Sequence, residues 1–239
     1  MKSLNQYIQE KLIINKDYHD NMIAVKSFDE LRKIIEDRYK KLGPGTKKNP
    51  IDFNDIDVSN LDSFCNDKGK GIFEGTKFKY IDISSWDVSN IKSMRSMFHW
   101  CKELKSVGDI SEWDVSNVTD MQYMFCKVVN FNQDISKWDV SSVTDMKLMF
   151  GDCESFNQDL SDWNVSNVTN MLGMFYGCKS FNKDISSWNV SSVTDMSYMF
   201  GCCYSFNKDI SNWNVSNVTD VSNIFDDCPI KDEYKPKFK

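Results

Sequence analysis

The stretch FNQDISKWDVSSVTDMKLMFGDC, Phe131–Cys153, decides the fold because nearly the same letters recur before and after it. The recurrence is easiest to follow in the tryptophans that share its phase: Trp86, Trp113, Trp138, Trp163, Trp188 and Trp213. Their spacing is 27 residues once and then 25 residues four times. A fixed period of this length is typical of stacked repeats and not of a single globular core. The chain therefore reads as an array of about seven units, and its function has to be sought on the surface.

The apolar spacing changes partway through each unit. Val143, Met146 and Cys153 lie on one helical arc, with Ser142 in the position of a helix cap. Upstream, Ile135 stands between two polar residues, as in a half-buried strand that is stable only when neighbouring units pair with it. The sequence therefore predicts an α/β repeat solenoid similar to leucine-rich-repeat folds, with one short helix and one short parallel strand in each unit.

Both ends of the array differ from its middle. A capping box of Ser27 and Glu30 predicts a helix that ends at Leu42, and a weaker box of Ser3 and Gln6 predicts an earlier one. Worn end units are what a stacked array needs to close its core. The predicted segments are a helical N-terminal segment (1–45), a linker with a degenerate first unit (46–85), the regular array (86–228) and a polar C-terminal tail (229–239).

Charge and hydropathy exclude several classes of protein. Residues 51–239 hold 18 Lys or Arg against 28 Asp or Glu, which argues against a nucleic-acid partner because phosphate binding needs clustered positive charge. The sequence contains no apolar run of about 18 residues, so we do not expect a membrane-spanning helix. Glu10 and Lys11 interrupt the segment where a signal peptide would be apolar. The sequence alone therefore favours a cytoplasmic or virion-associated location.

Three kinds of apolar residue recur in phase and are predicted to form the core. They are the tryptophans above, the phenylalanines Phe131, Phe156, Phe181 and Phe206, and the cysteines Cys101, Cys153, Cys178, Cys203 and Cys228. A small buried thiol at a repeated position is expected to stay reduced, since successive units rarely bring two Cα atoms within disulfide range. The alternative for the aromatic rows is an exposed platform for a ligand such as a sugar.

Two rows of polar residues recur as well. The first is a candidate calcium ladder, since hard oxygen ligands in series suit Ca²⁺, and its alternative is a solvated row of turn residues: Asp82, Asp109, Asp134, Asp159, Asp184 and Asp209. The second follows each tryptophan and is predicted to bond backbone N–H groups in turns: Asp87, Asp114, Asp139, Asn164, Asn189 and Asn214. The sequons at Asn117, Asn167 and Asn217 fall on the same repeated letters and are read as its by-products.

Positions that vary between units are the candidates for an interaction surface. One varying row, predicted to lie on the outer face of the helices, is Ser96, Tyr123, Leu148, Gly173, Tyr198 and Asn223. Another, on the strand side, is Ser85, Glu112, Lys137, Asp162, Ser187 and Asn212. Within them Tyr123, Leu148, Tyr198, Lys137 and Asp162 are the residues expected to contact a partner. Stacked repeats commonly bind through an extended surface of this kind.

Catalytic chemistry has little material in this chain. The two histidines, His19 and His99, have no nucleophile repeated beside them, and neither a Cys-x-x-Cys pair nor a phosphate-binding glycine loop occurs. We therefore expect neither an enzyme nor a bound cofactor.

The words DISxWDVSxVTDMxxMFxxCxxFN, over residues 81–228, resemble the 25- to 26-residue repeats of the BspA-like bacterial surface proteins, including listerial and mycoplasmal lipoproteins. The resemblance implies a non-enzymatic array engaged in adhesion or in binding a protein or glycan at the cell surface. The chain departs from that family in lacking an export signal, a lipid-anchor cysteine and a wall-anchoring tail.

The N-terminus suggests a second kind of function. MKSLNQYIQE resembles the short capsid-targeting peptides of internal proteins in large tailed phages, which implies a virion-associated assembly component addressed by its N-terminal helix. The other expectations for residues 1–50 are self-association through the helices and a cap over the apolar edge of the first unit.

Overall fold

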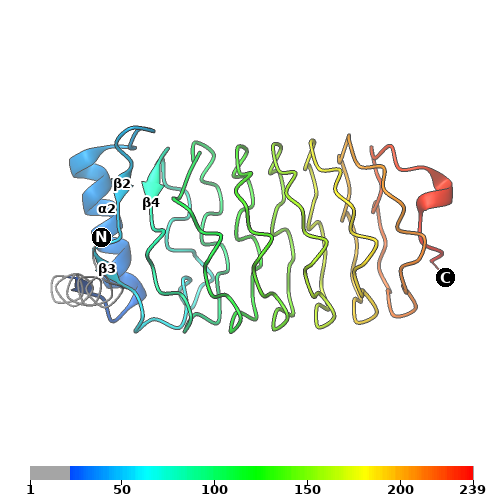
Figure 1. Ribbon diagram of the computed structural model, residues 1–239, viewed down its shortest axis with the longest axis horizontal. Helices are drawn as coiled ribbons and strands as arrows, with labels where there is room; N and C mark the ends of the chain where they lie inside the picture. Colours follow the sequence, from blue (N-terminus) through cyan, green and yellow to red (C-terminus); the bar gives the residue numbers. More distant parts are fainter. Residues whose placement is uncertain (1–21, 239) are drawn as a thin grey trace, which may run out of the picture.

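The computed structural model describes residues 22–238, in which successive units stack along one long axis with the two ends of the described chain far apart (Figure 1). Residues Ser3 and Gln6, His19 and the targeting-like peptide lie outside the described residues. Neither of the helices found in residues 22–238 could span a membrane.

The predicted α/β solenoid, with a helix and a strand in every unit, is wrong. The described residues contain one α-helix, α2 (Phe28–Leu42), and a short 3-10 helix, η1 (Asp232–Tyr234). Their strands are two residues long: β1 (Ile23–Ala24), β2 (Ile51–Asp52), β3 (Ile56–Asp57) and β4 (Ile81–Asp82). These form two parallel pairs, β1 with β3 and β2 with β4, in the registers Ile23 to Ile56 and Ile51 to Ile81. The regular array consists of turns and irregular segments, joined by isolated parallel bridges.

A chain of overlapping turns replaces the predicted helix. Leu148 and Asp152 have left-handed backbone (φ 51° and 58°), which cannot continue a right-handed α-helix. The N–H of Met149 donates to the Met146 carbonyl three residues back, whereas the N–H of Leu148 donates to the Leu172 carbonyl of the next unit at 2.8 Å. Because every second N–H leaves the unit in this way, the α-helical ladder never forms. We call residues 145–153 and their equivalents in other units the turn ribbon.

A turn also replaces the predicted strand at residues 134–136. The N–H of Ser136 donates to Asp134 Oδ1 at 2.9 Å, and the N–H of Trp138 donates to the Ile135 carbonyl at 3.2 Å. Neighbouring units are joined here by a side chain, since Trp138 Nε1 donates to the Ile110 carbonyl at 2.9 Å. Because the hydrogen bonds of residues 134–138 are made within this turn, these residues do not pair with neighbouring units as a continuous parallel sheet.

The core prediction is confirmed for the tryptophan and phenylalanine rows. The in-phase tryptophans are at most 6% exposed. The predicted phenylalanines are at most 3% exposed, and their rings stack from unit to unit, as Phe131 does on Phe156 at 5.9 Å between centroids and 9° between planes. Four of the five in-phase cysteines are buried, Cys228 is half-buried, and all of them are free thiols. Cys153 Sγ donates to the Phe125 carbonyl of the preceding unit at 3.0 Å. These stacked rows supply the apolar burial that a single unit could not.

Helix α2 begins and ends where the sequence predicts. Ser27 Oγ accepts the N–H of Glu30 at 3.2 Å, and the left-handed Gly43 (φ 75°) donates its N–H to the Tyr39 carbonyl at 2.8 Å. The helix buries Leu31 and Ile35 against the first units. It therefore closes the N-terminal end of the core.

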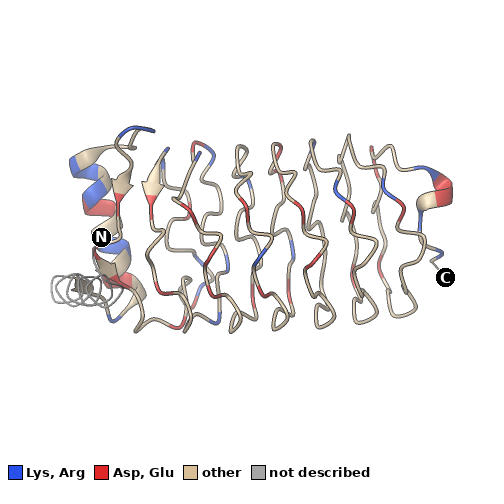
Figure 2. Ribbon diagram, in the orientation of Figure 1, with Lys and Arg blue, Asp and Glu red and all other residues tan. Residues whose placement is uncertain are grey.

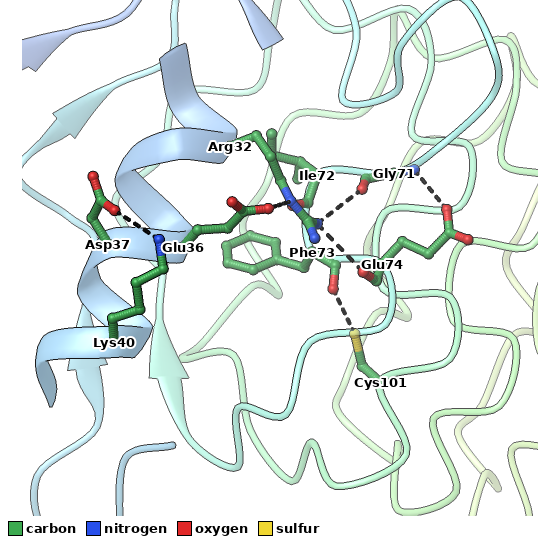
Figure 3. Close-up of polar contacts among 9 residues, drawn as sticks. All are labelled: Arg32, Glu36, Asp37, Lys40, Gly71, Ile72, Phe73, Glu74 and Cys101. Atoms are coloured by element: carbon green, nitrogen blue, oxygen red, sulfur yellow. Dashed lines mark hydrogen bonds and ion pairs between the residues drawn. The ribbon is translucent and has the colours of Figure 1, made fainter. Parts of the chain in front are cut away.

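Arg32 completes this closure (Figure 3). Its Nη1 donates to the Ile72 carbonyl at 2.7 Å and to the Glu74 carbonyl at 3.4 Å. One unit later, the equivalent carbonyls of Met97 and His99 accept N–H groups from the preceding turn ribbon. The Arg32 guanidinium thus supplies the hydrogen-bond donors that, elsewhere in the array, come from the preceding unit.

The last ten described residues fold back over the opposite end. Ile230 and Pro236 are buried, and the Ile210 N–H donates to the Tyr234 carbonyl at 3.0 Å. The Lys231 N–H donates to Asn207 Oδ1 at 3.1 Å. The segment expected to be a polar tail is therefore an end cap with buried apolar residues.

Candidate functional site

The varying row predicted on helix faces lies instead on left-handed residues of the turn ribbon. Tyr123, Leu148 and Tyr198 have φ of 58°, 51° and 57°. Tyr198 is 42% exposed, while Tyr123 and Leu148 are half-buried. The row is therefore exposed only in part, since Ser96 is buried and position 173 is a glycine.

Two tyrosines of later units lie near Leu148. Tyr176 lies beside Tyr198, with ring centroids 6.2 Å apart in an edge-to-face arrangement. Glycines make room for this layer: a Cβ at Gly173 would lie 2.8 Å from Leu148 Cδ2, and one at Gly201 would lie 3.0 Å from Tyr176 Cδ2. The larger side chains therefore cover the glycine of the following unit.

Trp100 belongs to the same region and was missed by the sequence analysis. It is 44% exposed, and its backbone is left-handed with φ of 62°. The signal was present, since Trp100 is the one tryptophan of the seven outside the repeated phase. We call the following set the corner stripe: Trp100, Tyr123, Leu148, Tyr176, Tyr198 and Tyr204.

Cys202 lies between two tyrosines of the stripe. Hydrogen bonding and charge interaction with Cys202 raise the pKa of the Tyr176 hydroxyl, and the same two interactions raise the pKa of Tyr204. Tyr204 is 53% exposed. Both phenols stay protonated at neutral pH, so this part of the stripe offers rings and hydroxyl donors.

His99 joins Trp100 to Tyr123. Its ring lies 6.0 Å from the Trp100 ring and 5.4 Å from the Tyr123 ring. His99 Nδ1 is 3.5 Å from Glu74 Oε1. Burial lowers the pKa of His99, and Lys127 adds to this, against the opposite effect of Glu74. The imidazole is therefore mostly neutral at pH 7.

Lys137 and Asp162 are exposed but lie apart from the stripe. Lys137 pairs with Glu112 of the preceding unit, which raises the pKa of the lysine. Within residues 22–238, no hydrogen bond, ion pair or ring contact joins either residue to the corner stripe. The structure thus separates the predicted interaction residues into two surfaces.

The candidate calcium row has its oxygens engaged in turns. In each unit of the array the carboxylate Oδ1 accepts the N–H of the serine two residues later, as Asp159 does from Ser161 at 3.0 Å. These hydrogen bonds lower the pKa of the carboxyls of Asp109, Asp134, Asp159, Asp184 and Asp209. Across the described part of the chain, no three His, Cys, Asp or Glu side chains are grouped to hold a metal ion.

The row that follows each tryptophan has the predicted turn role. Asp139 Oδ1 accepts the Ser141 N–H at 3.0 Å, and Asn164 Oδ1 accepts the Ser166 N–H at 3.2 Å. The helix-cap role predicted for the neighbouring row is wrong, because Asn167 Nδ2 donates to the Ser141 carbonyl of the preceding unit at 2.7 Å. The sequon asparagines Asn117 and Asn217 do the same.

A third polar row lies at the bridges between units: Asp120, Asp145, Asn170, Asp195 and Asp220. In the structure Asp145 Oδ1 accepts the Lys147 N–H at 2.9 Å, and Asp145 Oδ2 accepts Asn170 Nδ2 at 3.2 Å. Burial raises the pKa of Asp145, and the charge of Asp120 adds to the rise.

Comparison with known proteins places most of the chain in one family. The model of the family described as "Mycoplasma protein of unknown function, DUF285" matches residues 67–177 and 158–233, together more than two thirds of the chain. No curated protein and no solved structure matches this chain.

Proposed function

Since the chain belongs to the family of Mycoplasma proteins described as DUF285, we propose that it is a non-catalytic scaffold that binds a protein or glycan through the corner stripe. The repeated words over residues 81–228 support the closer relationship to BspA-like surface proteins, and adhesion is the role that this relationship favours.

One observation supports the proposal most. The polar side chains that recur in every unit form hydrogen bonds within the array, whereas the exposed aromatic side chains do not recur from unit to unit. The aspartates accept backbone N–H groups within turns, as Asp134 does, and the indoles donate hydrogen bonds to the preceding unit, as Trp138 does. By contrast Trp100, Tyr198 and Tyr204 are 44%, 42% and 53% exposed. Exposed aromatic side chains gathered on one face are typical of an interaction surface.

Asparagine is the replacement that tests the stripe cleanly. Tyr123, Leu148 and Tyr198 are left-handed, and asparagine tolerates that backbone better than alanine does. The same row contains Asn223, with φ of 53°. The triple variant Tyr123→Asn, Leu148→Asn, Tyr198→Asn should therefore fold like the parent chain.

The experiment measures binding of the full chain to a defined panel of immobilised glycans and extracellular-matrix proteins. The triple variant should lose at least ten-fold in affinity for whichever panel members the parent binds, with an unchanged melting temperature. The double variant Lys137→Ala, Asp162→Ala should bind like the parent. Loss in the double variant alone, or no binding by the parent to any panel member, would contradict the proposal.

A further inference from the structure

We propose that the Trp100 end of the corner stripe is a binding site for an acidic glycan, meaning a polysaccharide that carries carboxylate or sulfate groups. This inference rests on the proposed function and names its ligand class. The site consists of the rings of Trp100, His99 and Tyr123 and the cations around them, and we call it the ring platform.

The three rings of the platform are neighbours but are not coplanar, with interplanar angles of 65° between His99 and Trp100 and 40° between His99 and Tyr123. His99 is within 6.0 Å of Trp100 and 5.4 Å of Tyr123, measured between ring centroids. The Trp100 side chain is 44% exposed, whereas the other six tryptophans are at most 6% exposed. A sugar ring has an apolar C–H face that packs on an exposed aromatic ring, so the platform offers the kind of surface that sugars use.

Four cations converge on two of these rings. Lys102 Nζ and Lys127 Nζ lie 4.5 Å and 4.2 Å from the centre of the Trp100 ring. Around Tyr123, the guanidinium of Arg95 lies at 5.9 Å and Lys147 Nζ at 5.8 Å. Cation–π contact holds two ammonium groups over the Trp100 ring, so a bound glycan takes the place of at least one of them on the ring while its anionic group pairs with the displaced lysine. The platform therefore gathers positive charge at one place.

Acidic groups also lie near the platform, and one of them is Asp145, whose carboxylate interacts with the charge of Lys147. Glu74 faces His99 at 3.5 Å, and Asp152 Oδ2 lies 3.8 Å from Lys127 Nζ. Arg95 also donates to the neutral side chain of Gln122 at 3.0 Å. Elsewhere in the array, Lys and Arg are scattered among Asp and Glu (Figure 2), and the whole chain has a net charge of −6. Like charges gathered against that background make a local field that attracts anions.

The backbone favours a glycan over an acidic peptide. The Trp100 N–H donates to the Cys126 carbonyl at 2.9 Å, the Tyr123 N–H to the Lys147 carbonyl at 2.9 Å and the Lys127 N–H to the Gly151 carbonyl at 2.7 Å. A peptide strand that added to this surface would find these donors already used. Recognition therefore falls to rings and cationic side chains, which suit a sugar with an anionic substituent.

The test uses the full chain and follows Trp100 by fluorescence. Because Trp100 is the exposed tryptophan, acrylamide should quench it first, and binding of heparin or polygalacturonate should protect it. Neutral dextran should give no protection. Polyglutamate and phosphatidylserine vesicles serve as the acidic peptide and anionic membrane probes. Tighter binding to either of these than to both polysaccharides would overturn the inference.

Matched variants separate the platform from general charge. Lys102→Gln with Lys127→Gln should lower the affinity for the acidic polysaccharides at least ten-fold. Lys92→Gln with Lys105→Gln removes the same charge from exposed lysines elsewhere and should change it less than two-fold. Trp100→Asn, which suits the left-handed backbone, should also lose at least ten-fold. Equal losses in the two lysine pairs would show unspecific attraction and contradict the inference.

Failure of this inference differs from failure of the proposed function. A parent chain that binds a protein or neutral glycan through Tyr198, yet shows no protection of Trp100 by either acidic polysaccharide, would overturn the glycan site and leave the scaffold function standing. A chain that binds no member of either panel would overturn both.

Discussion

At the scale of single residues, one hydrogen bond is repeated between units. The indole Nε1 of Trp163 donates to the Ile135 carbonyl of the preceding unit at 3.1 Å, and Trp138, Trp188 and Trp213 make the same contact. Trp113 Nε1 is the exception, since within residues 22–238 it is buried with no hydrogen-bond partner. The 27-residue step from Trp86 to Trp113 is not by itself the reason, since the step from Ile56 to Trp86 is 30 residues and Trp86 Nε1 still donates to the Phe53 carbonyl at 2.9 Å.

Phenylalanine substitutions should measure that hydrogen bond. Trp163→Phe removes one of the two donors to the Ile135 carbonyl, which keeps the Trp138 N–H, at a cost of about 0.5–1.5 kcal/mol in addition to lost packing. Trp113→Phe loses similar packing but removes a donor that had no acceptor. Urea unfolding should therefore show a smaller loss of stability for Trp113→Phe, by ~1 kcal/mol. Equal losses would mean that the hydrogen bond contributes nothing.

The contribution of Asp145 to the stability of the folded chain depends on pH. Burial and the charge of Asp120 raise its pKa in the folded chain. A group whose pKa is raised on folding favours the folded state below its unfolded pKa, and that advantage is lost as the pH rises through the folded pKa. At pH 7 the half-buried carboxylate is therefore destabilising, whereas Asn170 fills the equivalent position without charge.

Replacing Asp145 with asparagine should stabilise the chain at neutral pH. The amide oxygen can still accept the Lys147 N–H, and removal of the charge next to Asp120 is expected to outweigh the loss of the hydrogen bond from Asn170 Nδ2. We expect the melting temperature of Asp145→Asn to rise by ~2 °C at pH 7 and to match that of the parent near pH 3. Asp139→Asn, at an exposed turn position, is the control and should show no such difference between the two pH values. A gain for Asp145→Asn that persists at pH 3 would contradict the electrostatic explanation.

At the scale of elements, α2 covers the N-terminal end of the array (Figure 1). Its apolar face covers the first units, with the Tyr39 and Phe78 rings in edge contact at 5.0 Å between centroids. Arg38 forms a two-pronged contact with Asp55, which lowers the pKa of that carboxyl. The helix is thus attached by both packing and charge.

Arg32→Met tests the polar part of this attachment. Removing the guanidinium leaves the Ile72 and Glu74 carbonyls without their donor, and hydrogen bonds from a charged group contribute roughly 1.5–3 kcal/mol. Hydrogen exchange should show faster exchange of the α2 amides, together with a lower melting temperature. Lys33→Met, on the exposed part of the same helix, should change neither. An equal effect in both variants would show that helix propensity, and not the capping of carbonyls, is responsible.

At the scale of the whole molecule, the 25-residue period is the property that every row depends on. Each Asn of the row Asn132, Asn157, Asn182 and Asn207 accepts, through Oδ1, an N–H from the following unit. Such rows hold only while equivalent residues lie one above another. Stability should therefore follow from whole units and the contacts between neighbours.

Deletion of whole and partial units tests this directly. Removal of residues 132–156 takes out one period and joins Phe131 to Asn157 in phase. This variant should unfold in one transition, with an unfolding enthalpy lower by ~17 kcal/mol for the 25 residues lost. Removal of the 20 residues 132–151 shifts every later row and should abolish cooperative unfolding in calorimetry. Equally cooperative unfolding of both variants would contradict the dependence on register.

The sequence by itself determined the period, the buried aromatic rows, the ends of α2 and the turn role of the residues after each tryptophan. Each of these depends on contacts close in the chain or on identical neighbours one period away. The apolar spacing of Met146, Met149, Phe150 and Cys153 did not distinguish a helix from a turn ribbon, since both bury the same four side chains.

Only the tertiary structure decided between those two, because the competing hydrogen bonds run between units. The Leu148 N–H finds its acceptor on Leu172, and no local pattern of letters contains that partner. The same reason hid the Arg32 cap and the burial of Asp145. It also hid the ring platform, where Trp100, His99 and Lys127 meet only when two units are stacked.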